Sequence, residues 1–351
     1  MKITKLSLAT IIALGSISFA NAQNLEDAIK NVEVSGTVAY RYNDYEESTR
    51  NANKNKLLGS DSTNNYKIGI NLNSKINDDV KFNSRFIAGA ENTYDFATTN
   101  AKKDANSADT DGSVNVALSQ AYFGLTAIPN TVVNIGKQGL TTPYTVAVDI
   151  NGNEQNGTGI LALSTFGPIT AGAGYFNNPN IDQLTEINLT RGLSSTNTAN
   201  LADLNLDAGR DMYVATVQGD LDFVKLEAWY AGMQQTFGSY TLAATSNLDL
   251  AENAKLGLEA RYVNLKLDNE LASGDDRDNA MLRLAVDGKV SIVNARLAYT
   301  QTGKNGGLTA VDQDAKNASL GWFITSNGVP DAKYWQAALG ADILDNLNFT
   351  A

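Results

Sequence analysis

The chain has 351 residues, no cysteine, no histidine and a formal net charge of −11. Without histidine there are no Ser-His or Cys-His nucleophilic pairs and no histidine-ligated metals, and the acidic balance argues against nucleic-acid binding, which needs a basic surface. Without cysteine no disulfide can stabilise an exported chain, so stability must come from another source, such as the unbroken interstrand hydrogen bonds of a closed barrel.

The first 22 residues have the pattern of a secretory signal peptide. Lys2 and Lys5 give a positive start, an apolar stretch covers 6–14, and Ala20 and Ala22 are the small residues expected before a cleavage site. The apolar stretch is too short to cross a bilayer as a helix. We therefore predict a signal peptide over 1–22 and an exported chain over 23–351, whose charge becomes −13 once Lys2 and Lys5 are removed.

From residue 32 onward, one segment after another alternates apolar and polar residues. In the segment 32–42, Val34 and Val38 fall on one face, while Glu33 and Arg41 fall on the other. Such alternation is expected of β-strands that have one apolar and one polar face. It recurs along the chain, and these expected strands lie at 65–74, 80–90, 224–230, 255–262 and 280–287.

The connections between these segments alternate between short turns and long polar stretches. Short turns are expected at 77–79, 129–130, 167–168, 219–222 and 288–289. Long connections are expected at 43–64, 91–112, 138–158, 177–210, 266–278 and 301–332, and the short connection 233–238 departs from the pattern. Outer-membrane barrels have this arrangement, with periplasmic turns and extracellular loops. A tandem of soluble β-sandwiches shows the same alternation within strands and is the alternative.

We therefore predict an all-β fold, a transmembrane antiparallel β-barrel in the bacterial outer membrane. Aromatic residues near the strand ends, among them Tyr40, Tyr42, Trp229 and Trp335, fit the girdles at the two membrane interfaces. Because bacterial single-chain barrels have an even number of strands, and the last expected strand (347–351) is short, we expect about 16–18 strands in the complete barrel. On this hypothesis, residues 23–351 lack the closing strands.

Two sets of motifs carry resemblances to known porins. Gly136-Lys137-Gln138 at a strand end, followed by Pro143, resembles the general-porin pattern before the third long loop. That resemblance implies that 138–158 is an inward-folded constriction loop. The segments 24–36 (NLEDAIKNVEVSG), 156–160 (NGTGI) and 226–230 (LEAWY) resemble the major outer membrane protein family of Campylobacter and its relatives. This resemblance implies a homotrimeric, moderately cation-selective porin with Ca²⁺ in the lumen.

Charged residues on the polar face of the early strands are candidates for lining a lumen. The basic candidates are Arg41, Lys67, Lys81 and Arg85. The segment 138–158 adds the acidic candidates Asp149 and Glu154. Opposed charges across a narrow passage would order water and select solutes by size and charge. The alternative is that Asp149 and Glu154 are solvated loop residues.

The predicted function is passive diffusion of ions and small hydrophilic solutes, with a moderate preference for cations. We predict no enzyme activity and no required cofactor, because the chain lacks histidine and no motif places a pair of carboxylates. The expected partners are outer-membrane lipid, lipopolysaccharide and further copies of the chain. The cluster Asp275, Asp276 and Asp278 can bind divalent cations that bridge lipopolysaccharide, or it is simply solvated. A barrel that acts mainly as an adhesin or structural surface protein is the alternative function.

Overall fold

The computed structural model describes residues 32–50, 56–89, 96–98, 115–149, 154–179, 210–269, 271–319, 324–344 and 347–350. The predicted signal peptide lies outside these residues, as do most of the predicted loops 91–112 and 177–210. Within the described part no helix is long and apolar enough to cross a membrane, a finding that concerns helices alone.

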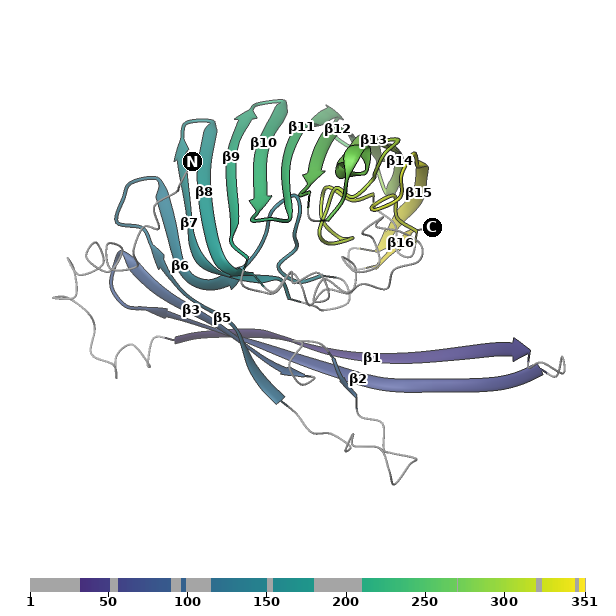
Figure 1. Cartoon of the computed structure of the whole chain (residues 1–351), viewed down its shortest axis with the longest axis horizontal. Coiled ribbons are helices and arrows are strands. Elements are labelled where there is room, and N and C mark those ends of the chain that lie inside the picture. Colours follow the sequence, from purple (N-terminus) through teal and green to yellow (C-terminus); the bar gives the residue numbers. More distant parts are fainter. Residues whose placement is uncertain are drawn as a thin grey trace, which may run out of the picture.

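In these described residues, sixteen strands form a single sheet in which neighbours pair antiparallel (Figure 1). The strands in chain order are β1 (Val32–Arg50), β2 (Lys56–Lys75), β3 (Val80–Gly89), β4 (Ala97–Thr98), β5 (Asn115–Leu125), β6 (Thr131–Gly139), β7 (Asn156–Phe166), β8 (Ile169–Pro179), β9 (Met212–Leu221), β10 (Val224–Met233), β11 (Phe237–Ala251), β12 (Ala254–Leu267), β13 (Asp278–Val290), β14 (Val293–Thr302), β15 (Lys333–Leu344) and β16 (Leu347–Thr350). Strand β4 pairs with β2, outside the main path. A short 3-10 turn, η4 (Gly274–Arg277), precedes β13. The prediction of an all-β antiparallel fold is confirmed.

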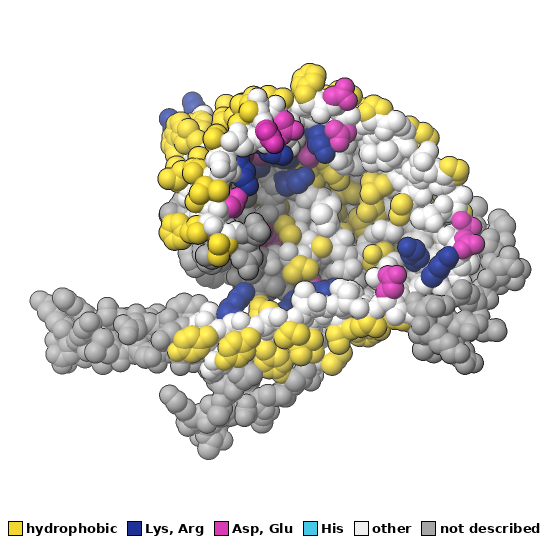
Figure 2. Space-filling view, turned by 180° about the vertical axis from the view of Figure 1, so that it is seen from behind, with side chains coloured by type: hydrophobic (Ala, Val, Ile, Leu, Met, Phe, Trp, Pro, Cys, Tyr) yellow, Lys and Arg dark blue, Asp and Glu magenta, His cyan; other side chains and the backbone are white. Residues whose placement is uncertain are grey.

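The sheet curves around a hollow, and its two faces differ in chemistry. On β12, Leu258 and Tyr262 are exposed on the outer face, whereas Arg261 and Val263 are buried on the inner face. Figure 2 shows hydrophobic side chains over the outer surface and charged side chains gathered inside the hollow. This distribution is expected of a wall between lipid and a polar lumen. A β-sandwich consists of two sheets packed face to face. The described strands form one curved sheet, so the structure does not support the sandwich alternative.

The connections follow the predicted alternation of length at most places. Short turns join β2 to β3, β7 to β8, β9 to β10 and β13 to β14. The predicted loop 43–64, in contrast, is mostly strand, because β1 continues to Arg50 and pairs in register with β2 from Lys56. The sequence of this segment is mostly polar and lacks the regular alternation of apolar and polar residues that predicts the other strands. The backbone hydrogen bonds of a sheet do not depend on that alternation.

In the described residues, β1 pairs only with β2 and β16 only with β15. The wall that the structure describes is therefore an open, curved sheet, from which the β1–β2 hairpin extends (Figure 1). The number of strands in the complete barrel stays a prediction.

The hydrophobic core lies inside the hollow. Two long connections, 140–155 between β6 and β7 and 303–332 between β14 and β15, contribute buried side chains that pack on the inner face. Leu140 and Tyr144 come from the first connection, and Leu308 and Val311 come from the second. The wall adds Phe176, Met212, Val263, Leu265 and Met281. The interior is thus partly filled by the chain's own loops.

We expect Leu284→Arg to destabilise the protein folded in lipid. Leu284 lies in the middle of β13 on the outer face, where an arginine would face hydrocarbon at a cost of roughly 2–4 kcal/mol. The measurement is urea unfolding in lipid vesicles, followed by tryptophan fluorescence, with Leu284→Ala as the control. An unfolding midpoint for the arginine variant equal to that of the control would contradict a lipid-facing position.

Candidate functional site: the narrowed lumen

The first inward connection is attached to the early strands through Glu154. Its buried carboxylate accepts a hydrogen bond from Arg85 Nε at 3.0 Å, and Arg85 Nη2 lies 2.8 Å from the same oxygen. Lys67 Nζ lies 3.4 Å away, and the Ser119 hydroxyl donates to the second carboxylate oxygen. Partners from β2, β3 and β5 therefore converge on one loop residue. A charge buried in this way depends on such partners, because burial has removed its hydration by water.

On the opposite wall, β12 and β13 carry a second charged cluster. Arg261 and Arg283 are direct cross-strand neighbours, a pairing of like charges that would repel without a counter-ion. Glu259 supplies it: its carboxylate accepts from Arg261 Nε at 3.0 Å and from Arg283 Nη2 at 2.7 Å. Glu227 of β10 adds a carboxylate 3.9 Å from Arg261 and 3.4 Å from Lys316.

The second cluster holds the connection 303–332 inside the hollow. Arg283 Nη2 donates to the backbone carbonyl of Lys316 at 2.7 Å, and Arg283 Nη1 donates to that of Ala318. Arg261 Nη1 donates to Asn317 Oδ1 at 3.4 Å. The guanidinium groups thus bind backbone and side-chain oxygens of a connection that has no helix or strand in its described residues, 303–319 and 324–332. The position of that connection depends on the wall beneath it.

The two inward connections also bind each other. Val311 N donates to the Tyr144 carbonyl at 3.0 Å, and Asn317 N donates to the Pro143 carbonyl at 2.9 Å. The Tyr144 hydroxyl accepts from Thr241 Oγ1 at 2.9 Å. Burial raises the pKa of the Tyr144 phenol, which keeps it neutral. The connections therefore behave as one packed unit across the lumen.

The structure brings three of the six predicted lumen residues into direct contact. Lys67, Arg85 and Glu154 are in direct contact, so these opposed charges form an ion pair and do not face each other across water. Asp149 is buried in the first inward connection. Two basic residues lie elsewhere: the Arg41 guanidinium stacks 4.3 Å above the Phe96 ring centroid, and Lys81 is exposed at the start of β3. Their role in conduction stays a prediction.

Sequence reasoning did not select the cluster around Arg261, Arg283 and Glu259 as a site. The signal was present, because these charges occupy mid-strand positions on the polar face, as Lys67 and Arg85 do. The inward course of 303–332 had no comparable signal. For Ca²⁺, the described residues contain no group of three acidic side chains close enough to hold a metal ion. Calcium in the lumen, which the family resemblance implies, stays a prediction.

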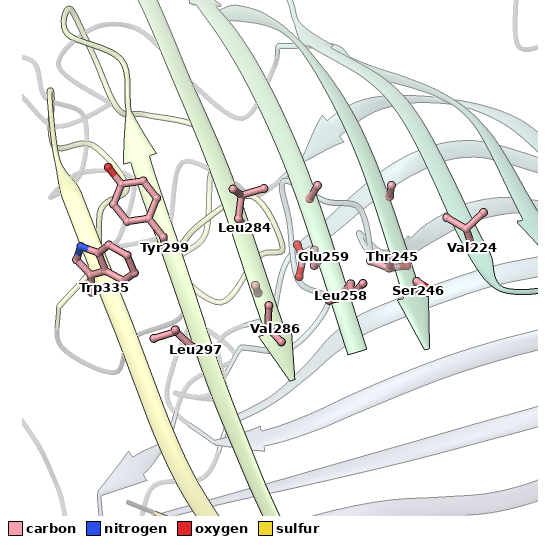
Figure 3. A pocket seen from close by; sticks show the side chains of 13 residues that line it. Val224, Thr245, Ser246, Leu258, Glu259, Leu284, Val286, Leu297, Tyr299 and Trp335 are labelled. Atoms are coloured by element: carbon pink, nitrogen blue, oxygen red, sulfur yellow. The ribbon is translucent and has the colours of Figure 1, made fainter. Parts of the chain in front are cut away.

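A shallow apolar groove marks the outer face over β10–β15 and lies apart from the lumen. Figure 3 shows Leu284, Val286 and Leu297 on this face, with Trp335 beside Tyr299. The ring centroids of that aromatic pair are 4.6 Å apart. Aromatic pairs of this kind suit the lipid-facing surface of a barrel.

A curved antiparallel wall with an apolar exterior, a charged interior and inward-folded connections defines an outer-membrane β-barrel porin. The family model for the Campylobacter major outer membrane protein matches residues 1–351. The chain belongs to this family, which places it in the bacterial outer membrane. No curated protein sequence gives a match.

Solved structures of Pseudomonas aeruginosa channels share the fold. OpdL is 14% identical with a TM-score of 0.59, and the match covers 89% of this chain and 74% of OpdL. OccK2 (OpdF) in complex with glucuronate is 12% identical with a TM-score of 0.63, covering 92% of this chain and 79% of OccK2. OpdK with vanillate is 10% identical with a TM-score of 0.63, covering 89% and 78%. At these identities the likeness concerns the fold alone.

We expect Glu154→Gln to destabilise the protein by roughly 3–5 kcal/mol, because Arg85 and Lys67 would keep their charges in a buried place after losing the carboxylate charge that lies against them. The matched control is Lys225→Gln, which breaks the exposed ion pair of Lys225 with Asp220 and should cost about 1 kcal/mol or less. Urea unfolding of both variants measures the difference. Equal effects would show that Glu154 is not held as a buried charge.

We expect Tyr144→Phe to loosen the two inward connections while the wall stays folded. The variant removes the hydroxyl that accepts from Thr241, a loss of about 1 kcal/mol. Fluctuations of the single-channel current should increase, because the connections cross the lumen. The control is Tyr240→Phe on the exposed outer face, and a noise increase of equal size in this control would exclude the loop contact as its origin.

Proposed function

We propose that the chain is a general diffusion channel that passes ions and small hydrophilic solutes with a moderate preference for cations. The observation that supports this is the packed unit of two inward connections, which narrows a charged hollow and leaves the curved wall around it. Passage through such a channel follows the solute gradient, and the width and charge of the narrow part limit what passes.

The charge distribution supports a weak rather than a strong selectivity. Lys67, Arg85, Arg261 and Arg283 each lie against a carboxylate of Glu154 or Glu259. Paired charges of opposite sign largely cancel at a distance, so the basic wall repels cations less than its composition suggests. The net charge, which is −11 for the whole chain and −13 without Lys2 and Lys5, then gives cations the advantage at the pore entrances.

We infer that the exported chain forms a homotrimer embedded in outer-membrane lipid and lipopolysaccharide, after cleavage of a signal peptide over residues 1–22. We also infer that it catalyses no reaction. A surface adhesin with the same wall would differ from this proposal in conductance, which makes conductance the discriminating measurement.

The experiment is single-channel recording of the purified, refolded full chain in a planar bilayer under a KCl gradient. We expect stepwise, ohmic conductance and a reversal potential that shows a modest cation preference. The protein should first pass a folding check, a heat-dependent shift of its mobility on a gel. Folded protein that gives no steps would contradict the diffusion channel and favour the adhesin. An anion preference would contradict the argument from net charge, but it would leave the diffusion channel standing.

A further inference from the structure

Gly69 lies under the side chain that anchors the first inward connection. It sits on the inner face of β2, where it is buried, and its cross-strand partner on β3 is Ile87. Arg85, two residues before Ile87, extends its guanidinium over this glycine. A β-carbon placed on Gly69 would lie 2.6 Å from Arg85 Nη2, 2.9 Å from Nη1 and 3.0 Å from Cζ. Any side chain at position 69 would therefore displace the guanidinium.

The displaced atoms are the ones that make the anchor. Arg85 Nη2 lies 2.8 Å from the Glu154 carboxylate, and Nη1 donates to Asn71 Oδ1 at 2.9 Å. A guanidinium is a planar fork, so both contacts depend on one orientation of the group. That orientation requires the guanidinium to rest on the bare backbone of β2.

The backbone conformation gives no separate reason for a glycine here. Among the described glycines, positive φ angles occur at Gly136, Gly167, Gly274 and Gly328, and position 69 has an ordinary strand conformation. Glycine inside a strand usually weakens it, and one common reason for its presence is the close approach of another group. The guanidinium of Arg85 is that group.

We propose that Gly69 is a positioning residue of the constriction. Its missing side chain lets Arg85 lie against β2 and reach Glu154, and through that contact it sets the position of the first inward connection. The consequence for solute passage rests on the proposed function, whereas the consequence for the connection's position does not.

The chain has no cysteine, so a single introduced thiol can report on the connection. Thr145 is buried in it, and Thr145→Cys makes a side chain that reacts with an uncharged maleimide only when the connection opens. In this background we expect Gly69→Ala to speed labelling at least roughly tenfold, the effect of losing one hydrogen bond to a charged group. Gly69→Ala adds and removes no charge, so faster labelling would come from the displaced position of the Arg85 guanidinium.

The matched control is Gly124→Ala. Gly124 is a strand glycine of β5 whose added β-carbon would meet Asn134 Oδ1 at 3.4 Å, an ordinary contact. Labelling in this variant should equal that of the parent. Unchanged labelling in Gly69→Ala, measured on protein that shows the heat-dependent gel shift, would overturn the proposal.

A double variant separates this mechanism from a general weakening of β2. Arg85→Ala removes both the anchor and the clash, so labelling should already be fast, and Gly69→Ala should add nothing to it. A full additional increase would overturn the proposal. If Gly69→Ala fails to fold alone, folding of the double variant supports the clash, and failure of both that variant and Gly69→Ala overturns it. A parent protein without conductance that shows the expected labelling would contradict the proposed function and leave this inference standing.

Discussion

The contact between the buried carboxylate of Glu154 and the basic groups of β2 and β3 is the interaction on which the narrowed lumen depends. A sheet with lipid on its outer face has to place its charges on the inner face, and there each charge needs a partner. Loop 140–155 supplies one partner and the wall supplies the others. The ion pair therefore holds the connection against the wall, and the rest of the constriction packs against the connection that it holds.

On the opposite wall, arginine side chains of β12 and β13 hold the other connection. Arg261 and Arg283 face each other across neighbouring strands. The carboxylate of Glu259 contacts both guanidinium groups and offsets the repulsion between them. Their remaining hydrogen-bond donors bind oxygens of the connection 303–332. Arginine suits this role because it carries five donors in a fixed fork and can serve a carboxylate and a backbone carbonyl at once. The two walls thus hold two connections, which meet at Tyr144 and Val311.

The sequence predicts the wall better than it predicts the lumen. Strands such as β12 and β13 are visible because an apolar face toward lipid imposes a period of two. The outer part of the β1–β2 hairpin could not be predicted, because its sequence is mostly polar and lacks this period. For the site, Lys67, Arg85 and Glu154 could be chosen by residue type and place. Their direct contact could not be predicted, nor could the inward course of 303–332, because both depend on groups distant in the chain, such as Arg283 and the carbonyl of Lys316.

The contact between the two inward connections also bears on the order of folding. Gln155 donates to Asp312 across 157 residues of chain, and the two residues meet inside the hollow of the curved wall. Contacts between such distant residues form late, since the chain must first lose the entropy of the intervening loop. We therefore expect the wall to curve before the lumen is narrowed. In that order of events, the buried charges lose their water only in the last step of assembly.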